Sequence, residues 1–197
     1  NKFNSLKFPS LEAQIASLSD DIAYNNHDIQ DGIRAKLFTL NHLKEINFFR
    51  EIIKSHKINI KRKNHEILVY QVIRDSINLM VKDLITTTMN NIKIFKIKNI
   101  SDVHSSKKNL VSFSNKFNNI EKEIKQFLRS KMYKNEYVLL KNNKGKLIIK
   151  KLFKEISKKP KKYLSKDQLK KGKYRAIADY ISGMTDRYAI NLYNKIK

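Results

Sequence analysis

The spacing of apolar residues constrains this sequence more than any other feature, because leucine, isoleucine and phenylalanine recur every three or four positions through most of it. That period matches the 3.6 residues of an α-helical turn, whereas half-buried strands would need strict alternation. Only four glycines and two prolines occur in 197 residues, so few positions interrupt helices. The sequence therefore predicts an all-α protein.

The chain divides into six expected helices joined by polar connections. Pro9 and Ser10 provide a stop and a capping hydroxyl directly before the first helix. No internal repeat or firm boundary is evident, and 197 residues fit one domain. We expect a loop with one short extended piece over 94–115 and a basic linker over 158–173. The expected helices cover residues 11–33, 34–55, 65–91, 119–133, 145–157 and 174–196.

The formal net charge of +24 comes from 42 lysines and arginines against 18 aspartates and glutamates. One interpretation is attraction of a polyanion, such as a nucleotide triphosphate or single-stranded nucleic acid. The other is compositional drift. AT-rich coding sequences favour lysine, asparagine and isoleucine, which accumulate at tolerant surface positions of the encoded protein. Lysine also lacks the planar fork with which arginine reads bases. The two interpretations predict different positions for the lysines and arginines. A nucleic-acid-binding protein concentrates its cations on one face, whereas drift scatters them over the surface.

Two classes of protein are disfavoured by composition. The sequence contains no cysteine, which excludes disulfides and thiolate metal sites. No apolar run approaches the roughly 20 residues that a membrane-spanning helix needs, and no signal-peptide pattern opens the sequence. We therefore expect a cytoplasmic protein without a membrane partner.

The stretch from Ser17 to Gly32 stands apart because it contains no lysine and four aspartates. On a helix, Asp20, Tyr24 and Asp28 are spaced i, i+4 and i+8, so their side chains follow one edge. A solvated polar face is one interpretation of this edge. Stacked like charges destabilise an isolated helix, however, so a bound cation or sugar hydroxyls would offset them. The opposite side carries the expected core stripe of Leu11, Ile15, Leu18, Ile22, Ile29 and Ile33.

Three stretches resemble one known family in the same order: PSLEAQIASLSDDIAYNNHDIQDGIRA, FLRSKMYKN and YRAIADYISGMTDRYAINLY. The sequence is identified by them as similar to the deoxyguanosine-triphosphate triphosphohydrolase-like proteins of the HD superfamily. The resemblance implies a helical enzyme that converts a deoxynucleoside triphosphate to the deoxynucleoside and tripolyphosphate. It also implies a divalent metal, Mg²⁺ or Mn²⁺, held by a His, a His-Asp pair and a distal Asp.

The resemblance assigns roles to four residues. Asp20 takes the place of the distal metal ligand, with Asp21 as its rival, because only Asp20 lies four residues before the tyrosine. Tyr24 would pack on or hydrogen-bond the deoxyribose, and Asp28 would accept from the 3′-hydroxyl. Tyr133 would line the nucleotide pocket. The family usually has a His two residues after this tyrosine, where the sequence has Asn135, so any contact from that position is in doubt.

The family's other metal ligands and its catalytic His and acid have no counterpart in this sequence. The only His-Asp dipeptide is His27-Asp28, which belongs to the distal helix. We therefore expect the C-terminal portion of such an enzyme, with no catalytic residue of its own, no metal bound by this chain alone, and homo-oligomers when complete. The alternative function is a non-catalytic, basic helical protein that binds nucleic acid.

Overall fold

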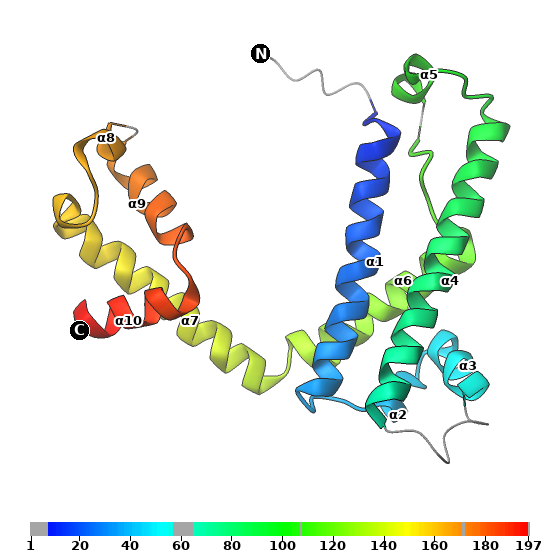
Figure 1. Cartoon of the computed structure of the whole chain (residues 1–197), viewed down its shortest axis with the longest axis horizontal. Helices are drawn as coiled ribbons and strands as arrows, with labels where there is room; N and C mark the ends of the chain where they lie inside the picture. The colour runs from blue at the N-terminus through cyan, green and yellow to red at the C-terminus, as the bar shows by residue number, and fades with distance from the viewer. Residues whose placement is uncertain (1–7, 57–64, 107, 171, 197) are drawn as a thin grey trace. The chain divides into compact units, whose positions relative to one another are not determined.

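The computed structural model describes residues 8–56, 65–106, 108–170 and 172–196 (Figure 1). All regular structure in these ranges is helical and no strand occurs in them, which confirms the predicted all-α class. A π-helical turn, Arg129–Tyr133, follows α6, and a 3₁₀ turn, Pro160–Lys162, precedes α8. The α-helices are α1 (Leu11–Arg34), α2 (Leu40–Leu43), α3 (Asn47–His56), α4 (His65–Ile94), α5 (Ile100–Ser105), α6 (Asn115–Leu128), α7 (Glu136–Lys158), α8 (Lys166–Leu169), α9 (Lys173–Ser182) and α10 (Asp186–Ile196).

The chain forms two compact units, Asn1–Lys134 and Asn135–Lys197, called unit 1 and unit 2 below. This differs from the expected single domain without an internal boundary. Each unit has its own cluster of buried apolar side chains, and this is the physical basis of the division. The boundary lies at Lys134 and Asn135, and neither glycine nor proline marks it in the sequence.

Unit 1 is built around the long helices α1 and α4, which lie side by side (Figure 1). Helix α3 packs on α4 and α6 packs on α1, so the core lies where these helices meet. Burial of such apolar faces supplies most of the stabilisation of helices in a folded protein. The most completely buried side chains of this core include Ile29, Phe38, Leu43, Phe49, Val72, Met80, Ile124 and Leu128.

Helix α1 begins where the sequence predicts, because the Ser10 hydroxyl accepts from the backbone N–H of Ala13 at 3.4 Å. Its predicted core stripe is only partly correct. Ile22 and Ile29 are buried, whereas Ile15 is 46% exposed. Gln14 is buried instead, since its side-chain oxygen accepts from the backbone N–H groups of Leu110 and Val111, at 2.8 and 3.1 Å. A polar residue at this point of the helix therefore holds a connecting loop.

The single helix expected over 34–55 is wrong in its first part, because α1 ends in a reversal after Arg34. The backbone N–H of Leu37 donates to the carbonyl of Gly32 at 2.9 Å, and that of Lys36 to Ile33 at 3.0 Å. This is a Schellman-type end, which needs a left-handed residue, and Lys36 takes that conformation with φ 58°. Glycine usually occupies this position, so a lysine there does not signal the end of a helix.

The loop expected over 94–115 contains the helix α5. Asn99 caps it, since its side-chain oxygen accepts from the Asp102 backbone N–H at 3.2 Å while Asp102 accepts from the Asn99 backbone N–H at 3.2 Å. Such a capping box satisfies two backbone donors that would otherwise lack partners. The expected loop therefore contains a helix, and no strand occurs within its described part, 94–106 and 108–115.

In unit 2, α7 packs against α9 and α10. Helix α7 starts nine residues earlier than expected because Asn135 caps it, its side chain accepting from the Tyr137 backbone N–H at 3.0 Å. The expected helix over 174–196 is interrupted after Ser182, and Thr185 then accepts from the Tyr188 backbone N–H at 3.3 Å. The expected linker over 158–173 also contains the 3₁₀ turn and α8.

Gly32 provides a test of packing in unit 1. A Cβ at this position would overlap the ring of Phe38, which is buried and meets Phe127 edge to face at 5.0 Å. We expect Gly32→Ala to lower the free energy of unfolding by about 1–3 kcal/mol, measured by urea denaturation. Gly145→Ala is the matched control, because a Cβ there meets nothing within 4 Å. It should raise stability by about 0.5–1 kcal/mol, and equal effects at both glycines would contradict the packing described here.

Candidate functional site

The acidic face of α1 points away from the core of unit 1. Burial of Ile22 and Ile29 fixes the rotation of the helix, so residues on the opposite side project outward. Asp20 is exposed, Tyr24 is 61% exposed and Asp28 is half-buried. The side chains that the sequence pattern places along one edge are therefore presented on the surface of a well-packed helix.

Tyr133 meets this face from the end of α6. Its hydroxyl donates a short hydrogen bond to Oδ2 of Asp28, 105 positions away in the sequence. Burial raises the pKa of Tyr133 well above its usual value, and the hydrogen bond to Asp28, the Asp28 charge and the neighbouring Tyr24 raise it further. The structure thus brings Tyr24, Asp28 and Tyr133 together, with Tyr133 as the protonated donor.

The placement of Tyr133 depends on the π-helical turn Arg129–Tyr133. The Lys134 backbone N–H donates to the Arg129 carbonyl at 3.1 Å, which is the five-residue step of a π-helix. The expected α-helix over 119–133 is correct up to Leu128 but not in this last turn. π-Helical turns are rare and occur frequently at functional sites. The sequence offered no signal for this turn.

The structure separates Asp20 from its rival Asp21. Asp21 accepts from Lys125 of α6 at 3.3 Å, and Lys125 also pairs with Glu121. The hydrogen bond to Glu121, more than the contact with Asp21, raises the pKa of Lys125. Asp20 has no hydrogen bond or ion pair in the part of the chain that the structure describes. Its carboxylate is therefore free to accept a ligand, whereas Asp21 is paired.

A divalent metal does not fit this face by itself. Mg²⁺ and Mn²⁺ need several oxygen or nitrogen ligands, and one carboxylate does not hold them. Within residues 8–56, 65–106, 108–170 and 172–196, no three side chains of the His, Cys, Asp and Glu types lie together. Asp20 can thus supply one ligand at most, and no chemical step is assigned to a metal held by the described residues.

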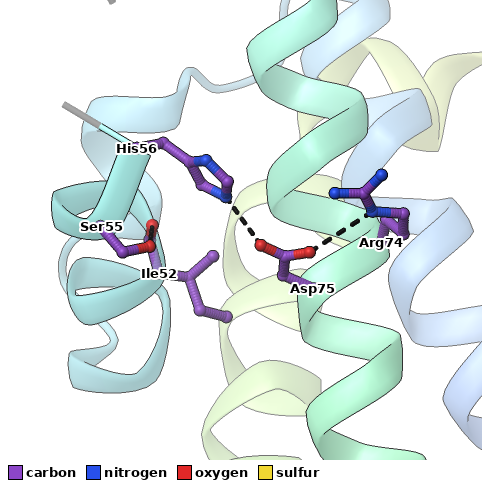
Figure 2. Close-up of polar contacts among 5 residues, drawn as sticks. All are labelled: Ile52, Ser55, His56, Arg74 and Asp75. Atoms are coloured by element: carbon purple, nitrogen blue, oxygen red, sulfur yellow. Dashed lines mark hydrogen bonds and ion pairs between the residues drawn. The ribbon is translucent and has the colours of Figure 1, made fainter. Parts of the chain in front are cut away.

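A second polar cluster joins α3 to α4 (Figure 2). His56 Nε2 lies 2.7 Å from Asp75 Oδ2, and Arg74 donates to the other carboxylate oxygen at 3.4 Å. Ser55 lies beside His56, but its hydroxyl donates to the Ile52 carbonyl at 2.7 Å. The serine is therefore not activated by the imidazole, and the cluster is not a nucleophilic triad. Sequence analysis missed His56 and Asp75 because they lie 19 residues apart on different helices.

The His56–Asp75 cluster borders a groove of about 980 Å³ between α3, α4 and α6. Its lining includes the apolar Phe48, Leu79 and Phe117 together with the oppositely charged Lys82 and Glu123. Because the lining carries both positive and negative side chains, it favours neither anionic nor cationic ligands. The groove therefore does not compete with the face of α1 as a nucleotide site.

Lysine placement differs between the two units. Residues 135–197 contain 18 lysines and arginines but only five acidic residues, whereas the longer stretch 1–134 contains 24 and 13. On α7, the exposed Lys150, Lys154 and Lys158 project away from the buried Ile148, Leu152 and Ile156. The same helix also exposes Lys141, Lys144, Lys146 and Lys151. Helix α7 thus carries seven of the 18 lysines and arginines of unit 2, and the others lie outside it.

None of the helices in the described ranges is both long and apolar enough to cross a bilayer. This agrees with the absence of a long apolar run in the sequence.

Comparison with known proteins confirms the resemblance found in the sequence. Residues 111–195 match the family model described as the phosphohydrolase-associated domain. The chain is 65% identical over 98% of its length to the deoxyguanosinetriphosphate triphosphohydrolase-like protein of Pelagibacter ubique (strain HTCC1062), of which it covers 52%. It is 37% identical over its whole length to the protein of the same name from Rickettsia rickettsii (strain Iowa), covering 53%. The chain thus spans about half the length of the curated relatives it matches.

The contact between Tyr133 and Asp28 predicts a pH dependence of stability. Folded Tyr133 holds its proton more tightly than unfolded tyrosine, whose pKa is about 10. This contribution to stability is fully present below about pH 10 and is lost as the pH rises further. Tyr133→Phe should therefore lose less stability than wild type between about pH 9.5 and 11.5, measured by urea denaturation. Tyr70→Phe, which alters an exposed tyrosine of the same unit, is expected to follow the wild-type curve.

Proposed function

We propose that this chain forms the sugar-binding side of the nucleotide site in a deoxynucleoside triphosphate triphosphohydrolase. The reaction would release the deoxynucleoside and tripolyphosphate with the help of a divalent metal, Mg²⁺ or Mn²⁺. The names of the relatives and the phosphohydrolase-associated match support a phosphohydrolase-related role. The observation that carries the finer assignment is the hydrogen bond from Tyr133 to Asp28, beside Tyr24, on the lysine-free face of α1.

Asp28 suits the 3′-hydroxyl of a deoxyribose because a carboxylate is an acceptor with two oxygens. Oδ2 takes the hydrogen bond from Tyr133, which holds the carboxylate in one orientation. Oδ1 has no partner in the described part of the chain and can accept from a sugar hydroxyl. In this proposal Tyr133 positions Asp28 and lines the nucleotide pocket, and Asp28 holds the sugar.

Tyr24 adds an apolar surface one turn before Asp28. Its ring is largely exposed, so a deoxyribose can pack on it without moving another side chain. A tyrosine offers both a flat apolar face and a hydroxyl tip, which matches a sugar with an apolar and a polar side. Fixing the sugar in this way would contribute to the reaction through positioning.

Asp20 is proposed as one metal ligand, four residues before Tyr24. Its unpaired carboxylate supports this role, but the described residues supply no companion ligands. The relatives are about twice as long as the stretch that matches this chain, so the proposal places the remaining ligands and the catalytic groups outside it. The chain by itself is not expected to release tripolyphosphate.

The sugar contact can be tested in a chimera in which this chain replaces the matching half of the Pelagibacter ubique relative. We expect Asp28→Asn to raise KM for dGTP about tenfold or more, since a hydrogen bond to a charged acceptor contributes about 1.5–3 kcal/mol. KM for 2′,3′-dideoxyguanosine triphosphate should not change, because that substrate has no 3′-hydroxyl. Tripolyphosphate release measures both constants.

Asp31→Asn is the matched control, since Asp31 lies on the same outward face and carries the same charge. It should leave KM and kcat near wild type, while Asp20→Asn should remove most activity and leave the fold intact. A chimera that folds with the wild-type thermal midpoint but releases no tripolyphosphate from any deoxynucleoside triphosphate would contradict the proposed function. Equal effects of Asp28→Asn on both substrates would contradict only the sugar contact.

Unit 2 supports a second candidate function, binding of single-stranded nucleic acid. The lysines on the outward face of α7 form a row that could follow a phosphate backbone, and exposed Tyr137 and Tyr174 offer rings for base stacking. Affinity for a fluorescent single strand of about 20 nucleotides should fall steeply with salt.

The double change Lys150→Glu and Lys154→Glu should weaken this binding and reduce the slope of log affinity against log salt by about 1–2. The same reversals at Lys116 and Lys122 of α6 serve as the control. Equal weakening by both pairs would mean that the attraction reflects only total charge. Fluorescence anisotropy at several salt concentrations measures the affinity and its salt slope for both double variants.

A further inference from the structure

Helix α4 is apolar on two opposite sides. One side packs on α1 and α3 through buried residues that include Val72, Ile73 and Met80. At 100° per residue, a second row lies roughly opposite and is exposed to solvent. The apolar members of this row, called the outer stripe, are Ile67, Tyr70, Val81, Ile85 and Met89, each at least 37% exposed.

The outer stripe has two parts along the helix, separated by the polar outward residues Gln71, Arg74 and Asn78. Ile67 and Tyr70 form the first part, and Val81, Ile85 and Met89 form the second, which covers 8 residue steps, or roughly 12 Å of helix. A surface helix normally has one apolar side and one polar side, and a helix that is apolar all round is buried. Exposed apolar patches of this kind mark interaction sites. The stripe is therefore suited to contact with another polypeptide.

The absence of lysine from this row strengthens the argument. Helix α7 exposes seven lysines along its length, beside apolar side chains such as Leu140. On α4, the outward positions 67, 70, 71, 74, 78, 81, 85, 89 and 92 contain no lysine, and Arg74 is their only charged residue. A face that stayed solvated would have no physical reason to remain apolar.

The length of the relatives indicates what covers the outer stripe. They match this chain over nearly all of its residues, yet the match covers only about half of theirs. They therefore contain about as much polypeptide again, which must pack somewhere. A second copy of this chain fits less well, because two surfaces that each belong to a chain of net charge +24 repel each other.

We infer that the outer stripe of α4 is the docking surface for a polypeptide that corresponds to the half of the relatives outside the matched region. Ile85 is 58% exposed, and Val81 and Met89 lie one turn to either side of it. The partner presents an apolar face to the outer stripe. The acidic face of α1 stays uncovered by this contact, because α1 packs on the opposite side of α4. This inference concerns assembly and does not depend on the proposed chemistry.

The test uses this chain, tagged and co-produced with the unmatched region of the Pelagibacter ubique relative as a separate polypeptide. The two should co-purify, and Ile85→Lys should weaken the complex at least about tenfold, because it places a charge in an apolar contact. Leu79→Lys is the matched control: Leu79 is also on α4 and 41% exposed, but it faces the groove toward α6.

Because the chain has no cysteine, single-cysteine variants give a direct readout of coverage. Alkylation of Ile85→Cys should slow at least about tenfold in the complex, whereas that of Leu79→Cys should not change. Failure of the two polypeptides to co-purify, or survival of the complex with Ile85→Lys, would overturn the inference. Slow alkylation of Ile85→Cys in the isolated chain would also overturn it. The molar mass from light scattering would then show whether a second copy or the same chain covers the stripe.

Discussion

The packing of α1 against α4 is the contact on which the rest of unit 1 depends. Ile22 and Ile29 bury one side of α1, and between them Asn26 donates to the Ile22 carbonyl at 2.8 Å and approaches the Met80 sulfur of α4 at 3.7 Å. Because a helix is rigid over this length, burying one side fixes where every other side chain points. The same contact therefore builds the core and turns Asp20, Tyr24 and Asp28 to the outside.

The candidate site also needs an element from the other end of unit 1. The π-helical turn after α6 carries Tyr133 to Asp28, and Lys125 of α6 pairs with Asp21. These contacts give Asp21 and Asp28 side-chain partners, whereas the carboxylates of Asp20 and Asp31 have none in the described residues. The division follows from geometry, since the four aspartates are chemically equivalent in the sequence.

The outward faces of α1 and α4 carry no lysine in the rows described above, and they differ in chemistry. The outward face of α1 is acidic with a tyrosine, which suits a ligand with hydroxyls and positive charge. The outward face of α4 is apolar, which suits another protein surface. On α7, by contrast, exposed lysines occur beside exposed apolar side chains such as Leu140 and Leu147.

The sequence by itself determined the helical class, the start of α1 at Ser10 and the shared edge of Asp20, Tyr24 and Asp28. These properties depend on residues within a few turns of each other, and helical periodicity and capping are local effects. Only the tertiary structure decided that α1 ends at a left-handed Lys36, that Gln14 is buried and that Ile15 is not. It also decided that Tyr133 reaches Asp28 and that His56 meets Asp75, because those contacts join residues that are distant in the sequence and close only after the helices have packed.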